Sequence, residues 1–156
     1  MRGFGLGALV MLAAMAVFAA ALRRRIAVVA VIGPSMQPAL TAGDRVLVRR
    51  ARISDVRPGQ IVVFEKPGDD GGWVTPPPRW TAGRREWMIK RVAAVPGDRL
   101  PDAMMAAAAH LAGPSVPAGK LVVLGDNAAR SRDSREIGYI PAERVLGVML
   151  RPLGHR

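Results

Sequence analysis

The run Ile26-Ala27-Val28-Val29-Ala30-Val31-Ile32, closed by Gly33-Pro34, indicates the fold class of this chain. It is short, rich in Val and Ile, and ends at a turn signal, as β-strands do. Comparable runs follow at residues 45–48, 60–64, 88–95, 120–124 and 144–150, separated by Gly and Pro. Six or so short strands predict a mainly β, barrel-like domain.

An apolar segment precedes these strands. Residues 4–22 are nineteen residues without a charge, and as a helix they span about 28 Å, close to the bilayer's hydrocarbon thickness of about 30 Å. We therefore expect residues 1–25 to be an N-terminal transmembrane anchor with a basic flank, and residues 26–156 to be one folded domain. A cleavable signal peptide is the alternative, because residues 19–21 are alanines, although its apolar region is usually about 7 to 15 residues.

The flanking charges bear on the orientation of this anchor. Arg2 and the amino terminus lie on one side, and Arg23-Arg24-Arg25 lie on the other. Positive-inside counting favours a cytoplasmic C-terminal domain by one charge. Two insertions interrupt the strands: an extended loop or ribbon at residues 69–86, and residues 99–119, whose alanine-rich part at 103–111 predicts a small helical cap.

Composition excludes several kinds of chemistry. The chain has no cysteine and two histidines, His110 and His155, so a thiol nucleophile, a Ser-His-Asp triad and a clustered zinc site find no natural candidates. We expect no metal and no cofactor. The net charge of +11 suits anionic membrane lipids or a merely solvated basic surface. Nucleic acid is not expected as a partner, because no helix-turn-helix or zinc-finger pattern accompanies the charge.

Two polar residues stand out within the apolar runs. Ser35 follows Gly33-Pro34 at the end of a predicted strand, where a turn exposes a hydroxyl for nucleophilic attack. An ordinary turn with Met36 in the core is the alternative. Lys90 lies inside the predicted strand at 88–95, so it either faces solvent from an edge strand or is buried, with a lowered pKa that lets it act as a base.

The densest polar stretch runs from residue 125 to residue 135, directly after an apolar run. Its composition is typical of a solvated loop of turn-forming residues. The alternative is a rigid loop in which a carboxylate and a guanidinium pair, and which orients a buried amine.

Four segments, in this order, resemble the type I signal peptidases, or leader peptidases, which are membrane-anchored Ser/Lys proteases. They are Gly33-x-Ser35-Met36-x-Pro38; Gly43-Asp44-x-Val46-x-Val48; Lys90-Arg91-Val92 with Pro96-Gly97-Asp98; and Gly125-Asp126-Asn127 with Ser131-x-Asp133-Ser134-Arg135 and Gly138. The last segment is the most specific of the four. The resemblance implies a signal-peptidase-like β-barrel catalytic domain with short insertions.

The resemblance also implies a role for each matched residue. Ser35 would be the nucleophile and its backbone amide an oxyanion donor, Lys90 would be the general base, and Ser131 would hold the lysine amine in place. A supporting network would consist of Arg91, Asp126, Asp133 and Arg135, with the last two forming an ion pair. Some members carry a serine as a second oxyanion donor where this chain has Gly33, so that donor is unidentified.

Expected substrates and location follow from the same resemblance. The substrates would be exported precursor proteins with small residues before the scissile bond, bound extended beside the strand that leads to Ser35. The protein would be a single-pass protein of the cell membrane with its catalytic domain outside the cytoplasm.

Two other functions are open. One is a dedicated maturation protease of the same fold that trims one precursor, on the cytoplasmic side if the arginines at 23–25 set the orientation. The other is a relative of the self-cleaving repressors, which share a Ser/Lys β-fold, or an inactive ligand-binding member. This third interpretation lacks a DNA-binding domain here and leaves the polar stretch at 125–135 unexplained.

Overall fold

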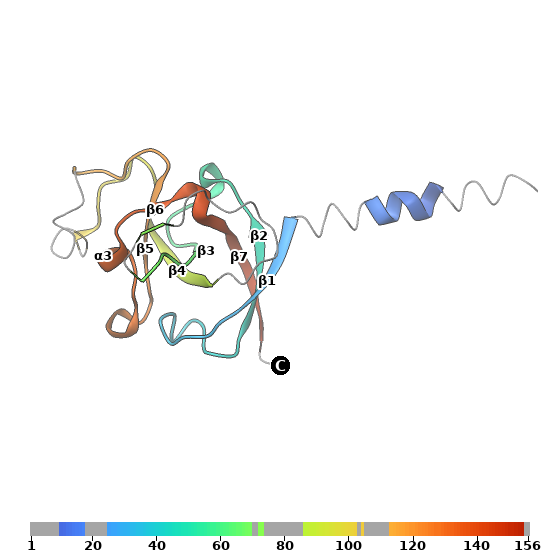
Figure 1. Cartoon of the computed structure of the whole chain (residues 1–156), viewed down its shortest axis with the longest axis horizontal. Helices are drawn as coiled ribbons and strands as arrows, with labels where there is room; N and C mark the ends of the chain where they lie inside the picture. Colours follow the sequence, from blue (N-terminus) through green and yellow to red (C-terminus); the bar gives the residue numbers. More distant parts are fainter. Residues whose placement is uncertain are drawn as a thin grey trace, which may run out of the picture.

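Seven strands form one antiparallel sheet in the order β1-β2-β7-β3-β4-β5-β6. The computed structural model describes residues 10–17, 25–69, 72–73, 86–102, 104 and 113–154. The strands are β1 (Ile26–Ala30), β2 (Arg45–Arg50), β3 (Ile61–Glu65), β4 (Trp87–Ala94), β5 (Lys120–Leu124), β6 (Ile140–Pro141) and β7 (Val145–Gly154). The sheet curls round on itself (Figure 1), so the prediction of a mainly β domain is confirmed as a curled antiparallel sheet.

Most strand boundaries lie close to those expected from the sequence. The exceptions are at the C-terminal end, where β7 continues to Gly154 and the two-residue strand β6 was not predicted. Short helices lie between the strands: η1 (Ile53–Asp55) follows β2, and η2 (Ala128–Arg130), α3 (Ser134–Ile137) and η3 (Ala142–Arg144) lie between β5 and β7.

β3 is a continuous apolar run because side chains on both of its faces are buried in the core. This strand lies between β7 and β4, and four consecutive residues of it are buried. Val62 packs in one hydrophobic cluster and Val63 in another, as expected when successive side chains point to opposite faces of a covered sheet. Cross-strand pairing then sets Lys90 opposite Val62 and Ile89 opposite Val63.

The loop between β1 and β2 is held by both backbone and side chain. Its ends are joined by hydrogen bonds from Val31 N to the Asp44 carbonyl (2.8 Å) and from Gly43 N to the Val31 carbonyl (2.9 Å). The Asp44 carboxylate accepts from Thr41 N at 2.7 Å, and Gly43 adopts a φ of 96° that favours glycine. Met36, 1% exposed, fixes the middle of the loop in the core.

Several sequence-based predictions fall mostly on residues outside this description. Of the expected anchor only residues 10–17 and Arg25 are described; residues 10–17 are helical, and their large apolar side chains are exposed. Within the described residues, no helix has both the length and the apolar character needed to cross a bilayer. Most of the insertion at 69–86, most of the alanine-rich segment at 103–111, and both histidines also lie outside the described residues.

Candidate active site

The side chains of Ser35 and Lys90 are in contact. Ser35 lies in the loop after β1, Lys90 lies on β4, and the lysine Nζ is 2.7 Å from the serine Oγ. Nζ also donates to the carbonyl of Ile89 at 3.1 Å. The lysine is only 3% exposed, which excludes the alternative of a solvent-facing residue on an edge strand.

Burial changes the acid–base chemistry of this lysine. Removal of the ammonium from water lowers the pKa of Lys90 below its ordinary value of 10.5, and the negative charge of Asp133 opposes part of that shift. A lowered pKa raises the fraction of neutral amine near neutral pH. The pair therefore combines a hydroxyl with a base that is able to accept its proton.

Asp133 is the centre of the polar loop and is fully buried. Its Oδ2 accepts from the Ser131 hydroxyl at 2.7 Å and from Gly125 N at 2.9 Å, and both of its oxygens accept from the Arg135 guanidinium. Burial alone would raise the pKa of Asp133, but these hydrogen bonds outweigh it and hold the pKa below the ordinary 3.8. The loop is therefore built around an ionised carboxylate.

The same aspartate begins a helix. Asp133 is the N-cap of α3 and accepts from Arg135 N at 3.2 Å, a regular use of aspartate at this position. Ser134 is buried in the first turn, and its hydroxyl accepts from Val123 N on β5 at 2.9 Å. Of the two alternatives for this stretch, the rigid loop is the one present, and it is docked against a core strand. This hydrogen bond of Ser134 was not predicted from the sequence, in which the residue appears only as part of a motif.

Gly125 lets the loop approach Ser35 closely. A methyl group at this position would lie 2.5 Å from Ser131 Cβ and 2.7 Å from the Ser35 carbonyl oxygen, which is closer than real contacts allow. Asn127 N donates to that same carbonyl at 3.0 Å. The polar loop therefore sets the backbone position of Ser35, a function that no local sequence signal indicates.

A second ion pair braces the other side of the loop. The Arg91 guanidinium forms two parallel hydrogen bonds with the Asp126 carboxylate, at 2.8 and 2.7 Å, and a third with the Gly59 carbonyl at 2.8 Å. A forked arginine–carboxylate pair is geometrically specific. It links β4, the strand of Lys90, to the residue that follows Gly125.

Among the described residues, Ser131 and Lys90 share no hydrogen bond. The Ser131 hydroxyl donates to Asp133, while the hydrogen bonds of Lys90 go to Ser35 and Ile89. A direct hydrogen bond from Ser131 to the Lys90 amine therefore stays a prediction. In this structure Ser131 donates to Asp133, and the negative charge of Asp133 acts on Lys90.

A cavity of about 170 Å³ opens beside the serine–lysine pair. Its lining comes from the end of β1 and from β4, and consists of Ala30, Val31, Ile32, Gly33, Ser35, Met36, Trp87, Met88, Ile89 and Lys90. The walls are mostly apolar, and the two polar side chains are those of Ser35 and Lys90. Among the described residues, no group of three His, Asp or Glu side chains is placed to hold a metal ion.

Comparison with known proteins gives consistent results. The model of one protein family, described as signal peptidase, peptidase S26, matches residues 5–101 and 102–153. A protein of Synechocystis named "Probable signal peptidase I-2" is 30% identical over 131 residues, which cover 72% of this chain and 56% of that protein.

A second curated relative comes from Schizosaccharomyces pombe. It is named mitochondrial inner membrane protease subunit 1 and is 30% identical over 115 residues, covering 70% of this chain and 61% of that protein. The chain thus spans less than two thirds of the length of either relative.

Proposed function

Because this chain belongs to the signal peptidase family, peptidase S26, we propose that it is a serine endopeptidase that removes signal peptides from exported precursor proteins. In this proposal Ser35 is the nucleophile and Lys90 is the general base. The observation that carries it is the 2.7 Å contact between Lys90 Nζ and Ser35 Oγ at a buried lysine.

The first step is acylation. Neutral Lys90 takes the proton from Ser35 Oγ as that oxygen forms a bond to the scissile carbonyl carbon. Negative charge develops on the carbonyl oxygen, and the backbone N–H of Ser35 is the proposed donor to it. Within the described part of the chain that N–H donates to no other group.

The same amine acts in the remaining steps, which complete acylation and then hydrolyse the ester. The Lys90 ammonium gives its proton to the leaving nitrogen, the C–N bond breaks, and an ester to Ser35 remains. Lys90, neutral again, takes a proton from a water molecule that attacks the ester. Collapse of the second tetrahedral intermediate returns the proton from Lys90 to Ser35 and releases the new carboxyl end.

Two strand edges flank the proposed substrate groove. In the described sheet, β1 pairs only with β2, and residues 87–90 of β4 pair with β3 on one side, since the β5 partners begin at Arg91. An extended peptide laid between these edges gains backbone hydrogen bonds in the manner of an added strand. The narrow apolar cavity at Ser35 suits a small side chain before the scissile bond.

The proposed location rests on the apolar segment at residues 4–22 and on the resemblance to membrane-anchored signal peptidases, although the flanking charges favour the opposite side by one charge. We propose that residues 1–25 anchor the protein in the cell membrane as a single-pass segment, and that residues 26–156 form the catalytic domain outside the cytoplasm, beside membrane lipids. The alternative is a dedicated maturation protease that trims one precursor. It is favoured by the likeness to a mitochondrial inner membrane protease subunit.

A cleavage assay with purified full chain and a panel of precursors tests the proposal. Ser35→Ala should abolish cleavage while the protein still folds, and Lys90→Arg should do the same because a guanidinium does not deprotonate in proteins. Lys120→Arg, at the start of β5, is the matched control and should keep wild-type activity.

Each outcome of this assay separates the candidates. Cleavage by Ser35→Ala would refute the nucleophile, and cleavage by Lys90→Arg would refute the base. Cleavage of many precursors supports a general signal peptidase, whereas cleavage of a single precursor supports the maturation protease. Protease accessibility in intact vesicles reports on which side of the membrane the domain lies.

A further inference from the structure

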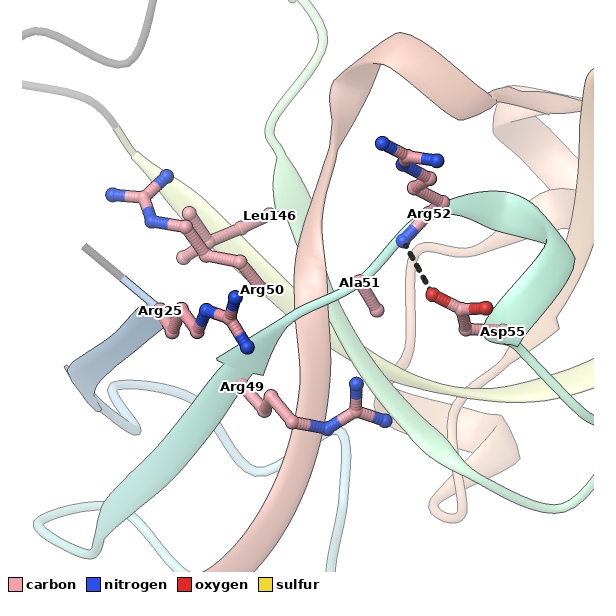
Figure 2. A pocket seen from close by; sticks show the side chains of 7 residues that line it. All are labelled: Arg25, Arg49, Arg50, Ala51, Arg52, Asp55 and Leu146. Carbon is pink, nitrogen blue, oxygen red and sulfur yellow. Dashed lines mark hydrogen bonds between the residues drawn. The ribbon is translucent and has the colours of Figure 1, made fainter. Parts of the chain in front are cut away.

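Four arginines surround a pocket at the end of the sheet where the folded domain begins. Arg25 lies one residue before β1, and the register of β1 with β2 sets Ile26 opposite Arg49. The end of β2 is thereby level with the start of β1. Figure 2 shows Arg25 reaching from the start of β1 towards the end of β2, with Arg49 and Arg50 around that end and Arg52 beyond Ala51.

The charge around this pocket is poorly balanced. Its lining holds four guanidinium groups and one carboxylate, that of Asp55. The Asp55 carboxylate faces the backbone N–H of Arg52 and the hydroxyl of Ser54, each at 3.4 Å, so it serves the turn around η1. Within the described residues, the side chains of Arg25, Arg49 and Arg52 form no ion pair. The pocket therefore presents excess positive charge to a ligand.

The shape of the pocket indicates which anion fits. Guanidinium groups bind phosphate oxygens through forked, paired hydrogen bonds, so several arginines in one pocket favour a phosphate group. The pocket has a volume of about 440 Å³, which leaves room for more than a bare phosphate. Leu146 and Ala51 supply apolar wall beside the arginines, as suits a ligand with a carbon backbone.

The position of Arg25 in the chain indicates where such a ligand is found. The apolar segment ends at Leu22, three residues earlier, and three extended residues reach at most about 10 Å. The headgroup layer on each side of a bilayer is about 5 to 7 Å thick. If residues 4–22 span the membrane, as the proposed function has it, the arginines lie at or beside the lipid headgroups.

We infer that this arginine pocket binds the phosphate of an anionic phospholipid headgroup. Binding there holds the start of β1 against the bilayer and fixes the tilt of the domain on its anchor. The site is distinct from the cavity at Ser35, since the two share no lining residue.

Calorimetric titration of the full chain in micelles of a neutral detergent tests this inference. Phosphatidylglycerol, phosphatidylcholine and inorganic phosphate are titrated separately. Two double variants are compared with wild type: Arg49→Gln with Arg52→Gln removes two pocket charges, and Arg45→Gln with Arg151→Gln removes two charges from the opposite ends of β2 and of its partner strand β7. The melting temperature of each variant without lipid checks that it is folded.

Saturable binding of phosphatidylglycerol but not phosphatidylcholine is expected. Each pocket arginine should contribute about fivefold, so the pocket variant should bind about 25-fold more weakly, and the control variant should bind like wild type. Equal weakening in both variants would overturn the site in favour of diffuse surface charge, and equal binding of the two lipids would overturn it as well. Inorganic phosphate that binds as tightly as phosphatidylglycerol, and competes with it, would overturn the lipid as the ligand.

Discussion

Replacing Gly125 with alanine tests whether the polar loop positions the nucleophile. The added methyl group would lie 2.5 Å from Ser131 Cβ and 2.7 Å from the Ser35 carbonyl oxygen, whereas ordinary contacts begin at 3.4 Å. Relief requires Ser131 to move by about 0.9 Å and the Ser35 backbone by about 0.7 Å. Because a misplacement of about 1 Å in an active site can cost about 100-fold, we expect kcat to fall about 10- to 100-fold.

Stability should change together with activity. Overpacking of a buried site costs about 1 to 3 kcal/mol, which for a domain of this size lowers the melting temperature by roughly 3 to 10 °C. The crowding also displaces Ser131 from Asp133, to which it donates at 2.7 Å. Both effects are measured on the purified full chain, by cleavage of a precursor and by thermal unfolding.

Gly33→Ala is the matched control for this experiment. It adds the same methyl group two residues before the nucleophile, where nothing lies within 4 Å and the backbone needs no glycine. Because Gly33 lines the cavity beside Ser35, this control is compared in stability, and we expect its melting temperature to hold or rise slightly. Wild-type kcat in Gly125→Ala would refute the reasoning, and a lowered melting temperature with unchanged kcat would show that the loop supports the fold without positioning Ser35.

Three further predictions concern proton transfer, the buried carboxylate and the oxyanion. The rate of cleavage should rise with pH through one ionisation below 10.5, because burial lowers the pKa of Lys90; a rate that is independent of pH below that value would contradict this. Asp133→Asn removes the charge that opposes the shift, so the ionisation should move to lower pH, and loss of the Arg135 ion pair should cost about 2 to 4 kcal/mol of unfolding free energy. Since the pKa of Asp133 is lowered on folding, its contribution is present above 3.8 and lost as pH falls through the folded value, so the two proteins should converge in stability in acid. Gly33→Ser places a hydroxyl in open space beside Ser35 and should raise kcat about tenfold if it reaches the oxyanion; an unchanged kcat in a folded protein would show that the hydroxyl does not reach it.

The sequence predicts the strands well, because Val- and Ile-rich runs are separated by Gly and Pro. It misses β6, which is two residues long and contains Pro141, and the extension of β7 through Pro152. Both depend on pairing with distant strands, which local composition does not encode. The sequence motifs also indicate the pair of Ser35 and Lys90, whose side chains are in contact.

Other features of the site depend on distances across the fold. The sequence leaves the burial of Lys90 open, because an edge lysine and a buried one share the same apolar neighbours along the chain. The contact of Gly125 with the Ser35 carbonyl joins segments ninety residues apart, so no local pattern predicts it. The donation of Ser131 to Asp133 likewise depends on how the loop folds back at α3.

For the peptidase proposed above, the cavity beside the serine–lysine pair has a consequence for when it cleaves. A peptide that fills this cavity removes water from around the Lys90 amine, and loss of hydration disfavours the ammonium form. The pKa of Lys90 therefore falls further once a substrate is in place. In the proposed mechanism, each substrate in this way helps to deprotonate Lys90, and between substrates a larger fraction of the amine stays protonated, which leaves Ser35 a weaker nucleophile towards stray peptides.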